Sequence, residues 1–312
     1  MSALSGIACS LKRSGKRLYG EGVETTNPRN RTARKIKRMT PKQRYLFDVT
    51  GYLHLENVIT GDALAEAAEA VDRYISCPLD ELPPGFEIQG LHQHGFAFDK
   101  SLECLTSHAA LWSIIKELTD NQPRFGRGSL KHDKHDLWEP GERAKVNPGG
   151  LHCARDDYGW YSTRYEVNNG RIYCDNFVCF PYFTDVYPGD GGLIVIPGSH
   201  KSEFDRPKEL LTLDEADGID PLDDPVFVNI TPKAGDIVII SELLTHGVLR
   251  WKPKDRDRRF LVLRYFPQYS GAHSFLQPIL DRLSPETLEL VASVPYGHIK
   301  DIVKQDAVTL TV

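Results

Sequence analysis

The sequence has few cysteines and no paired-cysteine motif. Six cysteines are scattered over the 312 residues without a CxxC pair: Cys9, Cys77, Cys104, Cys153, Cys174 and Cys179. Small secreted scaffolds that depend on disulfides carry cysteines at much higher density. We therefore expect free thiols in a reducing compartment, and a chain long enough to be stabilised by its hydrophobic core.

Long apolar runs are also missing. No stretch approaches the roughly 20 apolar residues that a membrane-spanning helix needs. Near the start, a short apolar patch precedes the basic residues, whereas a secretion signal places its charges first. These features predict a cytosolic (cytoplasmic) protein that has no membrane partner.

The formal net charge of −5 combines two parts of opposite sign. Residues 1–40 contain ten Lys and Arg against two Glu, a charge of +8, which leaves −13 for the remainder. The basic part has one aromatic residue, Tyr19, and no base-reading motif. The acidic remainder disfavours a nucleic-acid partner. We interpret residues 1–39 as a basic, disordered or extended arm that precedes a single domain over residues 40–312.

The first part of that domain has helical signals around one strand. Thr40 and Pro41 are a favoured N-cap and a favoured first helical residue, which predicts the start of a short helix. Residues 51–59, GYLHLENVI, are predicted to form a strand. Residues 61–76 have the apolar periodicity of an amphipathic helix, and a further helix is predicted over 101–119.

From about residue 123, short β-rich runs alternate with turn residues. The clearest are RIYCDNFVCFPYFTDV, GGLIVIP, PVFVNITP, GDIVIIS and RRFLVLRYF. Several short strands with regular turns indicate an antiparallel sandwich or barrel. We therefore predict a mostly β fold, a double-stranded β-helix (a cupin-like jelly roll) backed by the N-terminal helices, with a C-terminal extension after about residue 270.

Two of the eleven histidines stand in unusual positions. His152 follows the pair Gly149 and Gly150 in PGGLHCARDD, where glycine permits a tight backbone approach. His246 follows an apolar, β-rich run in GDIVIISELLTHG, and twelve residues later Arg258 opens RRFLVLRYF. Between the two histidines lies VYPGDGGLIVIPGSHK, a turn, a strand and a Pro-Gly corner.

In this order GYLHLENVI, LHCA, TDVYPGDGGLIVIPGSHK and a THG followed by arginine resemble the phytanoyl-CoA dioxygenase family of iron(II)/2-oxoglutarate-dependent oxygenases. The resemblance covers about residues 40–270. It implies that His152 and His246 bind iron(II), that Arg258 binds 2-oxoglutarate, and that dioxygen is consumed. Neutral imidazoles suit iron(II), and a forked guanidinium suits a carboxylate. Arg259 is the alternative to Arg258, because adjacent strand residues face opposite sides.

One position departs from the family pattern. The usual metal triad is His-x-Asp plus a distal His, whereas this chain has His152-Cys153-Ala154, and alanine cannot bind a metal. No histidine in the sequence is followed by Asp two places later. The occupants that remain open for the third ligand position are chloride, water, or a carboxylate from Glu242, Asp156 or Asp157.

Three functions are therefore open. The first is oxidation of a small organic metabolite by hydroxylation, desaturation or oxidative cyclisation. The second is radical halogenation, since halogenases of this class carry Ala or Gly at the position of Ala154 and bind chloride there. The third is a non-catalytic jelly-roll binding protein. The expected partner is a small-molecule substrate, whose identity the fold does not specify; the sequence defines no oligomeric state.

Overall fold

The computed structural model describes residues 39–86, 93–135, 150–156, 163–207, 210, 221–269 and 275–292. The predicted basic arm lies outside these residues, apart from the buried Met39. None of the helices in the described ranges has the length and apolarity that crossing a membrane requires. The five described cysteines are free thiols, as predicted, and Cys9 lies outside the described residues.

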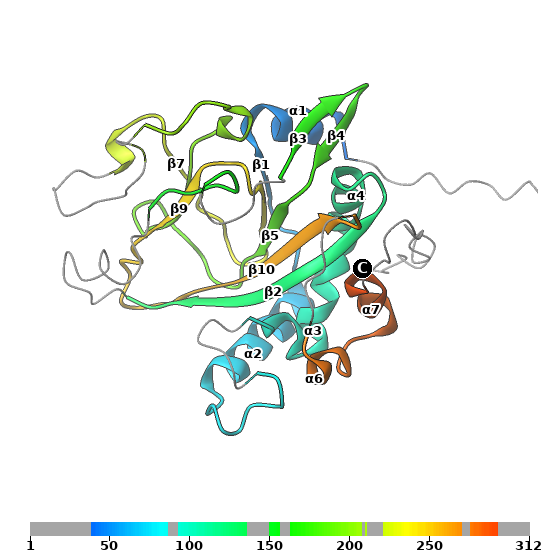
Figure 1. Ribbon diagram of the computed structural model, residues 1–312. Coiled ribbons are helices and arrows are strands. Elements are labelled where there is room, and N and C mark those ends of the chain that lie inside the picture. The colour runs from blue at the N-terminus through cyan, green and yellow to red at the C-terminus, as the bar shows by residue number, and fades with distance from the viewer. Residues whose placement is uncertain are drawn as a thin grey trace, which may run out of the picture. The chain divides into compact units, whose positions relative to one another are not determined.

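Two antiparallel sheets and a separate two-stranded hairpin form the described β part of the molecule (Figure 1). The large sheet has five strands in the order β1 (Tyr52–Leu55), β8 (Ile237–Ser241), β5 (Phe177–Pro181), β10 (Arg258–Pro267) and β2 (Pro123–Asp133). The small sheet has the order β7 (Val228–Asn229), β6 (Gly192–Val195) and β9 (His246–Leu249). A separate hairpin pairs β3 (Tyr165–Asn168) with β4 (Arg171–Cys174).

The helices are α1 (Pro41–Thr50), α2 (Gly61–Ser76), α3 (Lys100–Glu103), α4 (Ala109–Leu118), α6 (Gln277–Leu280) and α7 (Pro285–Val291). The first begins as predicted: the Thr40 hydroxyl accepts a hydrogen bond from the Gln43 N–H, and the Gln43 side chain accepts one from the Thr40 N–H. The second spans the predicted 61–76 range.

The single helix predicted over 101–119 is wrong. A short 3₁₀ turn over Cys104–Ser107 follows α3, and the chain then becomes extended at His108, with φ −53° and ψ 138°. His108 serves as the N-cap of α4, and its Nδ1 accepts the Ala110 N–H at 3.3 Å. The apolar periodicity continues across the break, so it did not reveal the break.

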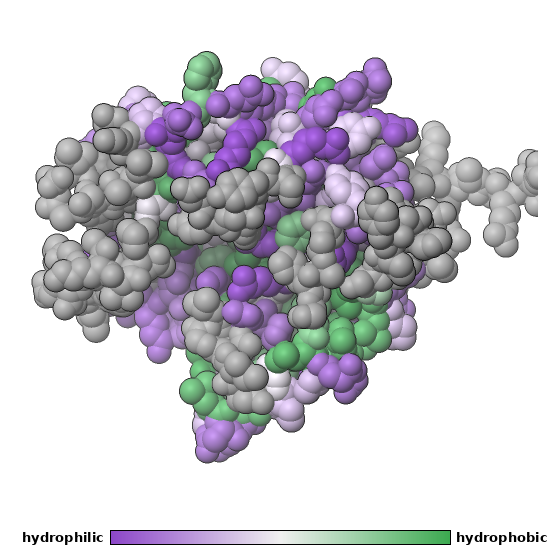
Figure 2. All heavy atoms as spheres, viewed as in Figure 1, coloured by the Kyte–Doolittle hydropathy of each residue, from purple (hydrophilic) through white to green (hydrophobic). Residues whose placement is uncertain are grey.

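The large sheet separates two hydrophobic cores, because successive strand residues point to opposite faces. One face, which includes Cys179, Ile239 and Leu263, packs against the helices. The opposite face, which includes Phe180 and Phe260, packs toward the small sheet. Figure 1 shows helices on one side of the large sheet and β7 and β9 on the other. This confirms antiparallel sheets backed by helices. The surface over α1 and the β3–β4 hairpin is mostly hydrophilic (Figure 2).

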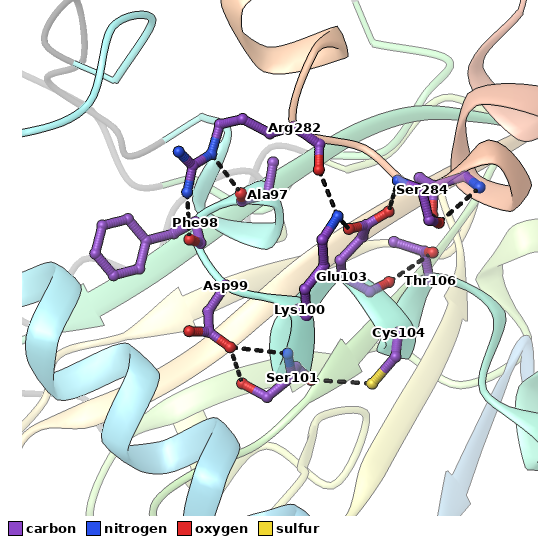
Figure 3. Close-up of polar contacts among 11 residues, drawn as sticks. Ala97, Phe98, Asp99, Lys100, Ser101, Glu103, Cys104, Thr106, Arg282 and Ser284 are labelled. Carbon is purple, nitrogen blue, oxygen red and sulfur yellow. Dashed lines mark hydrogen bonds and ion pairs between the residues drawn. The ribbon is translucent and has the colours of Figure 1, made fainter.

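A buried carboxylate joins the C-terminal segment to the rest of the domain (Figure 3). Glu103, at the end of α3, accepts hydrogen bonds from the Lys100 ammonium at 2.5 Å and from the Ser284 N–H at 2.6 Å. The Arg282 guanidinium donates to the backbone carbonyls of Ala97 at 3.1 Å and Phe98 at 2.7 Å. The residues after 270 that the structure describes therefore belong to the same hydrophobic core.

Replacing Glu103 with alanine is expected to lower the free energy of unfolding by about 1–3 kcal/mol at pH 7, because the Ser284 N–H loses its acceptor. Burial raises the pKa of Glu103, but hydrogen bonds from Lys100, Ser284 and Thr287 outweigh it, so the net pKa is lowered. Urea denaturation should therefore show the difference from wild type shrinking as the pH falls below the ordinary carboxyl range. Glu286→Gln, on the exposed side of α7, is the matched control and should change stability little.

Candidate functional site

His152 and His246 are adjacent in the fold. The His152 N–H donates to the His246 carbonyl at 2.9 Å, and the His246 N–H donates to the His152 carbonyl at 2.9 Å. Their imidazole centroids lie 4.2 Å apart. His246 opens β9 and is buried, whereas His152 is half-buried. Paired backbones and neighbouring rings allow both side chains to approach one common point.

The hydrogen-bond partners of the two rings suit imidazoles that bind a metal through Nε2. The His246 Nδ1 lies 2.7 Å from the Leu244 carbonyl, and the His152 Nδ1 lies 3.4 Å from the Gly150 carbonyl. A neutral ring that donates from Nδ1 carries its lone pair on Nε2, the form that binds a metal. Burial, together with the neighbouring His152, lowers the pKa of His246 to about 4. This donor set fits a divalent transition metal.

Ala154 is buried beside Glu242. The Ala154 N–H donates to the Glu242 carbonyl at 2.6 Å, and the Glu242 N–H donates to the Asn176 carbonyl at 3.0 Å. The Glu242 Oε1 lies 2.9 Å from an Arg264 guanidinium nitrogen. Glu242 stands in the turn between β8 and β9, four residues before His246.

The charge on Glu242 is set by its buried neighbours. Burial raises the pKa of its carboxyl, but interactions led by the Arg264 guanidinium outweigh it, so the net pKa is lowered. The carboxylate is therefore a buried anion paired with Arg264. Within the described ranges, no three His, Cys, Asp or Glu side chains are already gathered as a metal site.

The other two acidic candidates differ in their surroundings. The Asp156 carboxylate accepts the Cys153 N–H at 2.7 Å and forms an ion pair with Arg206. The first interaction lies within the loop after His152, and the second ties that loop to Arg206. Asp157 lies outside the described residues. Burial raises the pKa of the Cys153 thiol, which is the environment of a packing residue rather than of a reactive thiolate.

The neighbouring arginines at the start of β10 point in opposite directions. Arg258 is 1% exposed, and its Nε donates to Asp133 at 2.9 Å. Its Nη1 is buried and makes no hydrogen bond with any described residue. Arg259 is partly exposed and forms ion pairs with Asp72 and Asp257. Of the two, Arg258 therefore has the buried, incompletely bonded guanidinium that a carboxylate ligand could complete.

The glycines of the YPGDGG segment make room for this arrangement. Gly192 has φ +88°, and a Cβ on it would lie 2.6 Å from the Arg258 Nη1. Gly191 has φ +103°, and a Cβ there would lie 1.8 Å from the Arg250 carbonyl oxygen. Both positions thus require glycine, one for the guanidinium and one for the backbone. The characteristic sequence segment therefore packs directly against the Arg258 guanidinium.

Four basic side chains share the inner face of β2 and β10: Arg127, Lys131, Arg258 and Arg264. Arg127 and Lys131 are half-buried and have no hydrogen bond or ion pair with a described residue. Burial lowers the pKa of both, and neighbouring arginines lower it further, although Asp133 partly offsets the effect at Lys131. We did not identify these residues from the sequence. Two-residue alternation outward from Arg258 along β10 would have indicated Arg264.

Replacing Lys131 with methionine is expected to stabilise the protein by up to about 1 kcal/mol, because it removes a partly desolvated charge that has no ion pair with a described residue. The lowered pKa of Lys131 also means that wild type gains stability as the pH rises toward the ordinary lysine range. The Lys131→Met variant should lack that gain. Urea denaturation at neutral pH and at pH near 10 measures both effects. Lys201→Met, on the surface, is the control; equal effects of the two changes would contradict the argument.

Comparison with known proteins supports one family. Residues 47–252 match the family described as phytanoyl-CoA dioxygenase (PhyH). No curated protein is significantly similar to the chain. Solved structures with a similar fold include apo HygX from Streptomyces hygroscopicus, with 20% identity, TM-score 0.55, and coverage of 81% of this chain and 94% of that chain.

HygX with nickel and 2-oxoglutarate bound has 23% identity and TM-score 0.53, over 73% of this chain and 87% of that chain. The nickel complex of the non-haem monooxygenase ThoJ has 13% identity and TM-score 0.51, over 82% of this chain and 89% of that chain. Identities this low establish similarity of fold alone. The family match covers about two thirds of the sequence, and the chain belongs to the phytanoyl-CoA dioxygenase family.

Proposed function

We propose that this protein is an iron(II)- and 2-oxoglutarate-dependent oxygenase that oxidises a small organic metabolite within a double-stranded β-helix. The observation that carries the proposal is the reciprocal backbone pairing that brings His152 and His246 together. HygX, similar in fold, has been crystallised with iron and with nickel and 2-oxoglutarate. The free thiols of the described cysteines suit the reducing cytosol.

Each residue has a distinct role in this proposal. His152 and His246 hold iron(II) through neutral imidazole nitrogens, with their rings oriented by backbone carbonyls. Arg258 anchors the far carboxylate of 2-oxoglutarate with the buried Nη1 that faces Gly192. When bound, iron(II), 2-oxoglutarate and dioxygen supply the oxidising power that removes a hydrogen from the substrate. The hydrophobic core around Phe180 and Phe260 keeps water away from the face of β10 that carries Arg258.

The basic inner face favours a substrate with an anionic group. Arg127 and Lys131 lie on β2 with no ion pair to a described acid, and Arg127 stands opposite Arg264 in the sheet. Partly desolvated cations without an ion pair are costly unless a ligand supplies the missing charge. A carboxylate or phosphate on the substrate would meet both side chains. The Arg127→Gln and Lys131→Met variants should then weaken binding of such substrates.

Anaerobic spectroscopy tests the proposed function directly. Adding 2-oxoglutarate to the iron(II)-loaded protein should produce a charge-transfer band near ~500 nm, as expected when a 2-oxo acid chelates the metal. Exposure to air without substrate should then release succinate slowly. A non-catalytic binding protein would give neither signal. Absence of both from folded, metal-treated protein would overturn the oxygenase proposal in favour of that alternative.

Radical halogenation is the second candidate, because position 154 is alanine and its buried methyl group leaves a ligand position without a side chain. In that case chloride would bind the metal, and the substrate would gain chlorine instead of a hydroxyl group. The two reactions are separated by mass spectrometry of the products in the presence and absence of chloride. Whether a protein carboxylate occupies that position decides between them.

A further inference from the structure

We propose that Glu242 supplies the carboxylate ligand that position 154 lacks, exchanging its ion pair with Arg264 for a bond to the metal. This inference rests on the proposed iron site at His152 and His246. It makes the metal set two imidazoles and one glutamate, with the acid contributed from the β8–β9 turn.

The backbone of Glu242 is held beside the missing side chain. Its carbonyl accepts the Ala154 N–H at 2.6 Å, and its own N–H donates to the Asn176 carbonyl at 3.0 Å. A residue whose backbone is bonded directly to position 154 can direct its side chain to the region that an aspartate carboxylate at that position would occupy. Glutamate has one more methylene than aspartate, which provides the extra reach from the neighbouring turn.

The space and the charge at this place suit the exchange. Ala154 is 2% exposed and Glu242 is 4% exposed, so both lie in the interior, where a divalent cation needs an anionic partner to offset its charge. Glu242 is four residues before His246 in the same connection, and its carboxylate is already turned into the interior, where it contacts Arg264. A divalent cation competes with a guanidinium for such a carboxylate, because the metal carries the higher charge at shorter range.

The alternative acid is less suited to this exchange. The Asp156 carboxylate accepts the Cys153 N–H and pairs with Arg206, so its departure would break the loop that carries His152. Glu242 can leave Arg264 by side-chain rotation, while both of its backbone hydrogen bonds remain. With Glu242 on the metal, the position that a halogenase gives to chloride is filled, and oxygenation becomes the expected reaction.

Cobalt(II) binding to the full-length protein tests the inference without any turnover. We expect calorimetric titration to show that Glu242→Gln weakens cobalt(II) binding by about 30–100-fold, roughly 2–2.7 kcal/mol. Asp156→Asn, the matched change of the other acid, should alter the affinity less than about threefold, because the amide oxygen can still accept the Cys153 N–H that holds the loop. Circular dichroism confirms that each variant is folded. The visible cobalt spectrum, which reports the ligand set, should change only in the Glu242 variant.

Relocating the carboxylate provides the decisive variant. The double change Ala154→Asp with Glu242→Gln restores an acid at the family position and should return cobalt(II) affinity to within about threefold of wild type. If Glu242→Gln binds cobalt(II) as tightly as wild type while His246→Ala does not, the iron site stands and the role of Glu242 is overturned. If neither Glu242→Gln nor His246→Ala weakens cobalt(II) binding, the proposed metal site itself is wrong.

Chloride gives an independent readout. The charge-transfer band of the anaerobic iron and 2-oxoglutarate complex should be insensitive to chloride in wild type, because Glu242 occupies the position. In Glu242→Ala, which removes the carboxylate, added chloride should shift the band. The inference would be overturned if chloride shifted the wild-type band. It would also be overturned if the Glu242→Ala band responded to chloride in the same way as the wild-type band.

Discussion

Replacing His246 with alanine is expected to weaken metal binding by at least about 100-fold, since even the outer partners of metal ligands contribute 10–100-fold. The variant should lose the charge-transfer band and the release of succinate. The backbone pairing of residue 246 with His152 does not depend on the imidazole, so the fold should persist. Calorimetric titration with cobalt(II) measures the loss, and circular dichroism confirms that the sheet remains.

The matched control is His108→Asn. His108 caps α4 in the helical layer, and asparagine is an equally good N-cap, so both stability and metal affinity should be preserved. The expectation for His246 would be contradicted by a folded His246→Ala protein that binds cobalt(II) with the affinity of the His108→Asn protein. That result would place the metal site elsewhere.

Replacing Arg258 with methionine should raise the dissociation constant for 2-oxoglutarate by about 100-fold, about 2.7 kcal/mol, because the charge-assisted bonds to the far carboxylate are lost. The affinity for cobalt(II) without 2-oxoglutarate should stay close to wild type. Arg258→Lys should recover only part of the loss, since an ammonium cannot match the planar fork. Anaerobic titration of the charge-transfer band measures the constants.

Arg259→Met is the control for Arg258. Its side chain is partly exposed and engaged with Asp72 and Asp257, so removing it should change 2-oxoglutarate binding less than about twofold. Reversal of the two effects would assign the anchoring role to Arg259. Loss of binding in both variants would instead indicate a general disturbance at the start of β10, which thermal denaturation would detect.

Much of the framework follows from local patterns. The Thr40-Pro41 cap, the amphipathic helix over 61–76 and the runs that became β5, β6, β8 and β10 are recognisable because their signals lie within a few neighbouring residues. The same holds for the glycines before β6, since tight turns require them wherever they occur. The helix break at His108 was not predicted, because the apolar pattern continues across it.

The candidate site also has a part that local sequence predicts and a part that depends on the tertiary structure. His152, His246 and Arg258 could be selected from the order of short motifs, and their metal and 2-oxoglutarate roles remain predictions to be tested as above. The contact between Ala154 and Glu242, the pair of Glu242 with Arg264 and the inward cations Arg127 and Lys131 were not predictable from local sequence. They depend on strand register and on which face of a strand is buried, properties that arise when distant segments pair. The order of short motifs therefore predicts a site of two histidines and one arginine, whereas the occupant of the third ligand position depends on how the chain folds.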